Sequence, residues 1–157
     1  MLRTFAVLAA LSFAALPMTV PTAAWAQGAA GPVEGPCTSV KGPNTNYPGP
    51  FQVYFDLGKF NIRADEQANI ATIAQAIKDN QITRVCLLGT ADKIGNKDFN
   101  KKLSIDRAKS VANALIAKGI PGKSLIYNAT GEAYGGVSFG SADEQKKDRR
   151  VIVILAK

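Results

Sequence analysis

The stretch GTADKIGNKDFNKKLSIDRAKSVANAL, residues 89–115, decides how this chain is organised. Asp92 follows an apolar run, a polar loop with one glycine comes next, and Arg107 lies early in a strong helical pattern. An aspartate can bind an ammonium group, and an arginine can bind a carboxylate through two parallel hydrogen bonds. The residue types therefore leave two interpretations open: an internal Asp92–Arg107 salt bridge, or a clamp for a small zwitterionic group.

The same stretch lies within a predicted strand and a long helix. Residues 82–88 are mostly apolar and β-favouring, which predicts a central strand covered on both faces. The pattern from about residue 98 to residue 118 predicts a helix that ends at Gly119. Arg107 adjoins the apolar stripe of this helix, and Asn100 shares its face if the helix has already begun there. The expected stripe is Ala108, Val111, Ala112 and Leu115.

The remaining elements are expected as strands over 51–56, 124–130 and 149–155, a helix over 64–79 and a short helix over 142–147. Ile70, Ile73, Ala74 and Ile77 form one apolar stripe. Asn80 is the expected left-handed end of that first helix. A capping box from Ser141 to Glu144 predicts the short helix, and the apolar run 151–155 is expected to be buried. The order β-α-β-α-β-(α)-β predicts one α/β sandwich with helices on one or both faces.

The N-terminal part predicts export rather than folded structure. Residues 1–26 resemble a secretory signal peptide, with Arg3 at the positive start and Ala24-Trp25-Ala26 as a cleavage site. A retained amphipathic anchor is the alternative. Residues 27–50 are rich in glycine and proline and predict a loose leader, so residues 51–157 form one folded domain. No later apolar stretch approaches the roughly 20 residues of a membrane span, so we expect no transmembrane segment after signal removal.

Two cysteines, Cys37 and Cys86, are present in this exported chain. Cys86 belongs to an apolar strand pattern and Cys37 to the polar leader. In an oxidising compartment an even count permits one disulfide, which would join the leader to the sheet. The alternative is a buried free Cys86 and an unrelated exposed Cys37. Cys37 follows Glu34-Gly35-Pro36, far beyond the signal, so it does not resemble a lipid-attachment cysteine.

Composition excludes several classes of function. The formal charge of +7 suits an anionic partner or simply favours solubility. The basic residues are scattered, without a dense run and interleaved aromatics, so nucleic acid is not an expected partner. The chain has no histidine, and its cysteines lack zinc spacing. The loop after Asp92 lacks the oxygen spacing of a calcium loop. We expect no metal, no cofactor and no enzyme activity.

Residues 51–155 resemble the OmpA-like peptidoglycan-binding domain family. The matching features are the strand ending Phe55-Asp56, Gly119-Ile120-Pro121, Gly131-Glu132 and the closing run DRRVIVI. The most specific feature is the central stretch, with its aspartate-to-arginine spacing and the pattern N-x-x-L-S-x-x-R-A. The resemblance implies a mixed sheet of about four strands packed with two main helices.

The resemblance also implies a ligand and a site. The family binds the free end of diaminopimelate in the peptidoglycan stem peptide without covalent chemistry. Asp92 would then bind the ammonium group, or nearby backbone, and Arg107 the carboxylate. Asn100 and Arg149 match secondary positions, and Thr90 and Gly58 complete the expected secondary set, with contact roles left open. We expect a periplasmic protein associated with the cell wall or outer membrane, with outer-membrane proteins as further partners.

The chain departs from the family pattern at four places. Gly89-Thr90-Ala91-Asp92 replaces the usual G-H-T-D, and Phe99 replaces a tyrosine. Gly58 stands where a side chain often reaches the ligand, and Asp148 replaces an asparagine. These differences motivate a second hypothesis, in which the same fold is a periplasmic protein-interaction module with weakened or lost peptidoglycan binding.

Overall fold

The structure is a computed structural model that describes residues 31–37, 48–91, 96–132 and 147–157. Several predictions concern residues outside these ranges. They are the signal peptide over 1–26, Asp92, the capping box from Ser141 to Glu144 and all but the last residue of the helix over 142–147. Each of these stays a prediction.

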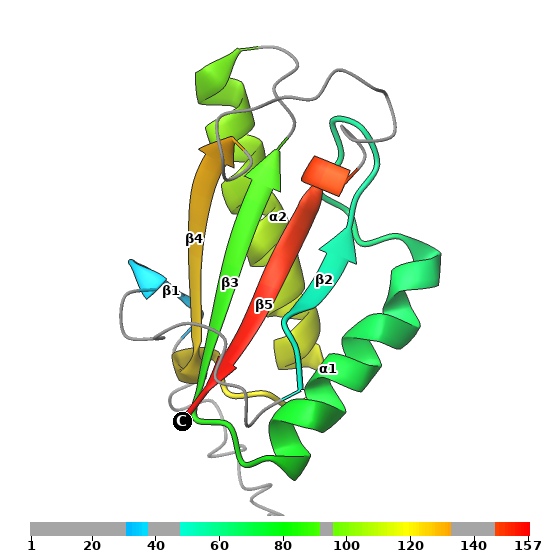
Figure 1. Ribbon diagram of the computed structural model, residues 1–157, viewed down its shortest axis with the longest axis vertical. Helices are drawn as coiled ribbons and strands as arrows, with labels where there is room; N and C mark the ends of the chain where they lie inside the picture. Colours follow the sequence, from blue (N-terminus) through cyan, green and yellow to red (C-terminus); the bar gives the residue numbers. More distant parts are fainter. Residues whose placement is uncertain (1–30, 38–47, 92–95, 133–146) are drawn as a thin grey trace, which may run out of the picture.

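One mixed sheet forms the centre of the described fold (Figure 1). Its order is β1 (Val33–Glu34), β4 (Leu125–Glu132), β3 (Arg84–Ala91), β5 (Arg150–Ala156) and β2 (Phe51–Tyr54). β4 runs parallel to β1 and β3, whereas β5 runs antiparallel to β3 and β2. The strands β2, β3 and β4 therefore end at the same edge of the sheet, where β5 begins. The α/β class and the mixed sheet are confirmed.

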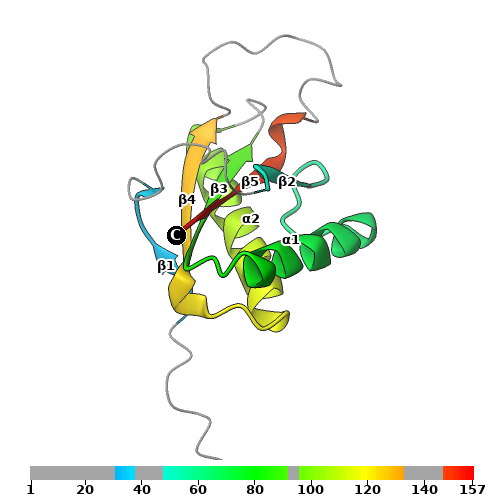
Figure 2. The same cartoon turned by 60° about the horizontal axis from the view of Figure 1, so that its bottom comes forward.

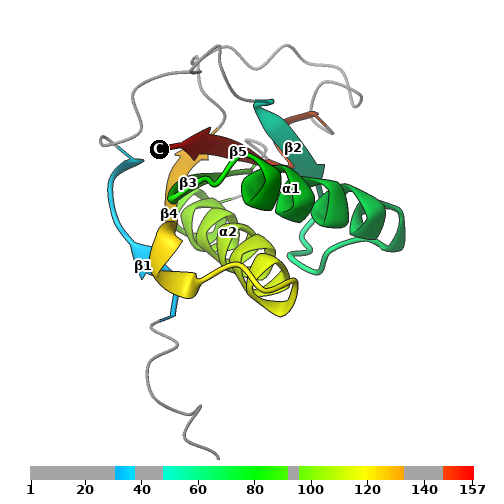
Figure 3. The same ribbon diagram turned by 90° about the horizontal axis from the view of Figure 1, so that it is seen from below.

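Both main helices cover the same face of this sheet (Figures 2 and 3). They are α1 (Gln67–Asp79), entered through the 3-10 turn η3 (Ala64–Glu66), and α2 (Lys97–Ala117), followed by the turn η4 (Gly122–Ser124). The predicted stripes are confirmed, because all eight of their side chains are buried and belong to one core. The 3.6-residue period of the sequence thus placed the buried face of each helix correctly.

The two helices end in the same way, through a residue with positive φ. At the end of α2, Gly119 has φ +87°, and Ile120 N–H donates to the Leu115 carbonyl at 3.1 Å. The prediction for Gly119 is confirmed. The prediction for Asn80 is wrong, because Asn80 has φ −92° and Gln81 takes the left-handed conformation at φ 51°. The Asn80 side chain instead donates to the Ala76 carbonyl at 2.9 Å and caps the helix.

The prediction that the strand runs are buried on both faces is only half right. Along β5, Val151, Val153 and Leu155 face the helices and are buried, whereas Ile152 and Ile154 are half-buried. Leu88 of β3 is half-buried as well. The cause is the layer arrangement, since α1 and α2 both lie on the opposite face of the sheet (Figure 3).

Part of the glycine- and proline-rich leader joins the sheet. Val33 and Glu34 pair in parallel with Ile126 and Tyr127 of β4. Three residues after β1, Cys37 forms a disulfide with Cys86 of β3, with a Cα–Cα distance of 5.7 Å. The bridge is therefore present, and it fastens a two-residue edge strand that would otherwise have little to hold it.

Removing this disulfide should destabilise the domain without changing its fold. The bridge closes a separation of 49 residues. On the chain-entropy account its loss costs about 2–4 kcal/mol of unfolding free energy. We expect Cys37→Ala/Cys86→Ala to show this loss in urea unfolding, with β1 amides exchanging faster than those of β3. Equal stability of the double variant and the oxidised wild type would contradict the prediction.

Candidate ligand-binding site

Four segments meet at the edge where β2, β3 and β4 end. They are the loop 55–62 after β2, the carboxyl end of β3, the first half of α2 and residues 147–150 leading into β5 (Figure 1). In parallel α/β units, ligands bind at the carboxyl ends of the strands, so this edge is the place to look for a site. The sequence-predicted residues Thr90, Asn100, Arg107 and Arg149 all come from these segments, and Gly58 lies in the first.

Arg107 joins these segments through its guanidinium group. Its Nε donates to the Lys59 carbonyl at 2.9 Å, Nη1 to the Thr90 carbonyl at 3.0 Å, and Nη2 to the Asp56 carbonyl at 3.1 Å. The guanidinium carbon also lies 5.4 Å from the centre of the Phe55 ring, within cation–π range. One side chain of α2 thus fixes the loop after β2 against the end of β3.

The Arg107 side chain is buried, with 0% of its surface exposed. Carbonyl groups carry no net charge, so the three hydrogen bonds orient the guanidinium without neutralising it. Burying a charged group is costly unless an opposite charge or several hydrogen bonds compensate. The expected charge partner, Asp92, directly follows the last residue of β3, Ala91, but lies outside the described residues. Both interpretations of the Asp92–Arg107 pair therefore stay open here.

The first turns of α2 are built from polar residues that face inward. The helix begins at Lys97, so Asn100 lies on the Arg107 face as expected, and it is buried. The Asn96 side chain caps the helix by accepting from Asp98 N–H at 2.8 Å. The Ser104 hydroxyl donates to the Asn100 carbonyl at 2.7 Å. Sequence reasoning missed Asn96 and Ser104; the Asn-x-Asp start of the helix was the available signal for the cap.

Thr90, an expected secondary ligand residue, holds two strands together. It is 3% exposed, and its hydroxyl oxygen lies 2.5 Å from the Asp148 carbonyl and 3.0 Å from the Arg150 carbonyl. A hydroxyl has one hydrogen to donate, so it serves these two acceptors in turn or shares it between them. Thr90 therefore ties the end of β3 to the segment that enters β5, beside Arg149.

Replacing Thr90 with valine should show this role. Valine keeps the shape but leaves the carbonyls of Asp148 and Arg150 without their donor, at a cost of about 1–3 kcal/mol. We expect Thr90→Val to lower the urea midpoint with an unchanged m-value, and Thr90→Ser to stay close to wild type. A Thr90→Val variant as stable as Thr90→Ser would show that the hydroxyl contributes nothing.

Gly58 gives the loop after β2 its shape. It has φ +65°, a conformation that other residues adopt only with strain. A Cβ atom added there would have no heavy atom within 4 Å. Gly58 thus contributes backbone and open space at this edge, and no side chain that could reach a ligand.

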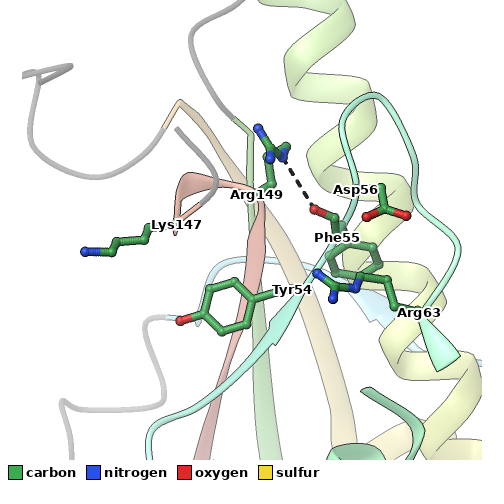
Figure 4. Close-up of a pocket in the computed structure, with 6 residues that line it drawn as sticks. All are labelled: Tyr54, Phe55, Asp56, Arg63, Lys147 and Arg149. Carbon is green, nitrogen blue, oxygen red and sulfur yellow. Dashed lines mark hydrogen bonds between the residues drawn. The ribbon is translucent and has the colours of Figure 1, made fainter. Parts of the chain in front are cut away.

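Beside this loop the structure contains a pocket of about 220 Å³ (Figure 4). It is lined by Tyr54, Phe55, Asp56, Arg63, Lys147 and Arg149. Arg149 is fixed at its edge by a hydrogen bond from Nε to the Phe55 carbonyl at 3.4 Å. Of these residues only Arg149 was expected at the site. The others come from separate loops and strand ends, where no periodic pattern marks them.

Arg63 is held in the pocket wall by Asp65. Its Nε donates to one oxygen of Asp65 at 3.0 Å, and Nη2 bonds the other oxygen. This paired contact raises the pKa of Arg63 above its ordinary value, so the group is cationic at any physiological pH. The contact also fixes the planar guanidinium at the pocket wall.

Within the described ranges, no three histidine, cysteine or acidic side chains gather as a metal site would need. Among those same residues, no helix is both long enough and apolar enough to cross a membrane.

Comparison with known proteins identifies the fold. The crystal structure of the peptidoglycan-associated lipoprotein from Burkholderia pseudomallei has a TM-score of 0.62 and 23% identity to this chain. The match covers 67% of this chain and 89% of that one. At this level of identity the likeness shows that the fold is shared.

Sequence relatives cover the same region. Outer membrane protein P5 of Haemophilus influenzae is 34% identical over 101 residues, 64% of this chain and 28% of P5. Outer membrane protein A of Shigella flexneri is 30% identical over 132 residues, 83% of this chain and 38% of that protein. The chain thus spans less than two fifths of either relative. The model of the OmpA family matches residues 54–149, which contain every expected ligand residue, and the chain belongs to this family.

Proposed function

We propose that this protein binds peptidoglycan without covalent chemistry, through the diaminopimelate residue of the stem peptide. The observation that carries the proposal is the placement of Arg107, a cation held by three backbone carbonyls at the carboxyl edge of the sheet. In this proposal Arg107 binds the carboxylate at the free end of diaminopimelate, and Asp92 binds the adjacent ammonium. The name of the Burkholderia pseudomallei neighbour, a peptidoglycan-associated lipoprotein, supports the choice of ligand.

The secondary residues have supporting roles in this proposal. Asn100 lies on the Arg107 face of α2, and Thr90 fixes the strand end from which Asp92 follows. Gly58 leaves room above the loop, and Arg149 adds positive charge beside it. We further propose that the protein is exported to the periplasm and localised by its hold on the cell wall, with no enzymatic reaction.

The burial of Arg107 sets a condition on this proposal. Because its side chain is 0% exposed, a ligand carboxylate reaches the guanidinium only when neighbouring groups move aside. The same burial favours the second candidate function, an OmpA-like fold used as a protein-interaction module, in which Arg107 has a purely structural role. Binding to the cell wall distinguishes the two functions.

A sedimentation assay with purified sacculi tests the proposal. We expect the wild-type protein to pellet with sacculi at moderate salt, and Asp92→Ala to stay in the supernatant. Asp92→Asn is the matched variant, since it keeps the size of the side chain and removes only its charge. Folding of each variant is checked by circular dichroism. Wild type left in the supernatant, or Asp92→Ala pelleting as well as wild type, would overturn the proposal in favour of the interaction module.

A further inference from the structure

The pocket formed by the end of β2, the loop after it and the segment before β5 lies directly beside Arg107. The Phe55 carbonyl accepts from Arg149, and the carbonyl of the next residue, Asp56, accepts from Arg107. Consecutive Cα atoms are about 3.8 Å apart, so the two guanidinium groups are anchored on neighbouring points of one backbone segment. Figure 4 shows Arg149 above this segment, with Asp56 and Arg63 on one side and Tyr54 and Lys147 on the other.

Positive charge prevails in this pocket. Arg63, Lys147 and Arg149 line it, against one lining carboxylate, Asp56. Asp65 offsets Arg63 through their paired contact. Lys147 is exposed, whereas Arg149 is half-buried and donates to the Phe55 carbonyl, so the pocket combines a fixed cation with an exposed one. Such a pair suits a carboxylate on a ligand that is already held nearby.

The pocket wall also provides a fixed aromatic ring. The Tyr54 hydroxyl donates to the Gln52 side-chain oxygen at 2.6 Å, and that oxygen also accepts from Arg150 Nη1 at 3.1 Å. This network holds the half-buried Tyr54 in place. A peptide could lay its apolar atoms against the ring while its charged group meets the cations.

We propose that this pocket is a second subsite, which binds another carboxylate of the stem peptide once diaminopimelate is held at Arg107. The inference rests on the proposed function. In a tetrapeptide stem, diaminopimelate stands between a glutamate that keeps its α-carboxylate free and a terminal alanine with its own carboxylate. Either group is a carboxylate within the same peptide, and Lys147 and Arg149 are the residues that bind it.

Calorimetric titration with four soluble probes tests the subsite. The probes are free diaminopimelate, the tetrapeptide stem, the tetrapeptide amidated at glutamate and the tetrapeptide amidated at its terminal alanine. We expect Lys147→Gln to weaken tetrapeptide binding about three- to tenfold. This loss of affinity lies between that expected for a screened ion pair and that expected for a charge-assisted hydrogen bond. Binding of free diaminopimelate should stay unchanged. Lys123→Gln, an exposed lysine in η4 at the opposite end of the sheet, is the charge-matched control.

The amidated probes identify the carboxylate. The amidated tetrapeptide that lacks the carboxylate bound in the pocket should bind wild type and Lys147→Gln with equal affinity. The other amidated tetrapeptide should still bind wild type more tightly than Lys147→Gln. Arg149→Lys, which keeps the charge, should weaken tetrapeptide binding less than Arg149→Gln. If wild type binds neither diaminopimelate nor tetrapeptide, the proposed function and the subsite both fall. If free diaminopimelate and the tetrapeptide both bind, but neither Lys147→Gln nor amidation changes the affinity for the tetrapeptide, only the subsite proposal is wrong.

Discussion

Arg107→Leu should lower the free energy of unfolding by at least about 4 kcal/mol and abolish binding to the cell wall. The substitution removes the hydrogen bonds from the guanidinium to the carbonyls of Asp56, Lys59 and Thr90. The Asp56 carbonyl keeps only the backbone N–H of Lys59 as a donor. A hydrogen bond from a charged group contributes about 1.5–3 kcal/mol, and this substitution removes three of them, one buried and two part-buried. Urea unfolding measures the lost free energy. In hydrogen exchange, the amides of the loop after β2 should exchange fastest.

A matched substitution on the same helix separates this effect from a general change of charge. Lys101 is exposed on α2, so Lys101→Leu should change stability by less than about 0.5 kcal/mol. Arg107→Lys keeps the charge and has three N–H donors, but these lie on one compact ammonium instead of a rigid planar fork. Its stability should fall between those of wild type and the leucine variant. If Arg107→Leu and Lys101→Leu have the same free energy of unfolding in urea, the Arg107 guanidinium does not hold these segments together.

Gly89→Ala should destabilise the domain by more than about 4 kcal/mol, or prevent it from folding. A Cβ atom at Gly89 would lie 2.0 Å from the Ser104 carbonyl oxygen and 2.8 Å from its carbon. Both are backbone atoms of α2, so no side-chain rotation can relieve the overlap and the helix must move away from β3. That movement would also displace Arg107, three residues further along α2.

Gly58→Ala is the control for this second prediction. It places a methyl group in open space and costs only the strain of its positive φ, about 1–2 kcal/mol. Thermal unfolding of the two variants side by side gives the comparison. A Gly89→Ala protein as stable as Gly58→Ala would mean that α2 and β3 do not approach as closely as the structure shows.

Local periodicity predicted the helices well, because each helix buries one stripe against one sheet. The stripes at Ile70–Ile77 and Ala108–Leu115 follow directly from that rule. The rule cannot foresee β1, since two residues carry no period and pair only because β4 lies beside them. It also cannot predict that Ile152 is half-buried, because that depends on both helices packing on the other face of the sheet.

The site shows the same limit more strongly. Residue types and family resemblance directed attention to Arg107, but its carbonyl partners Asp56 and Lys59 are 51 and 48 residues away in sequence. The pocket beside it combines residues from the end of β2, the loop between β2 and η3, and the segment before β5. Contacts between such distant segments can be predicted only once the order of the strands in the sheet is known. Gly89 was a missed clue, because a glycine inside a strand often marks a close backbone approach.

The most direct test of the proposed function compares two stem peptides that differ by one carboxylate. Lysine has the same side chain as diaminopimelate but lacks the terminal carboxylate that Arg107 is proposed to bind. In titrations of the wild-type protein with otherwise identical tetrapeptides, we expect the diaminopimelate form to bind about 10- to 100-fold more tightly, as loss of a charge-assisted hydrogen bond implies. Equal affinity for the two peptides would contradict the account.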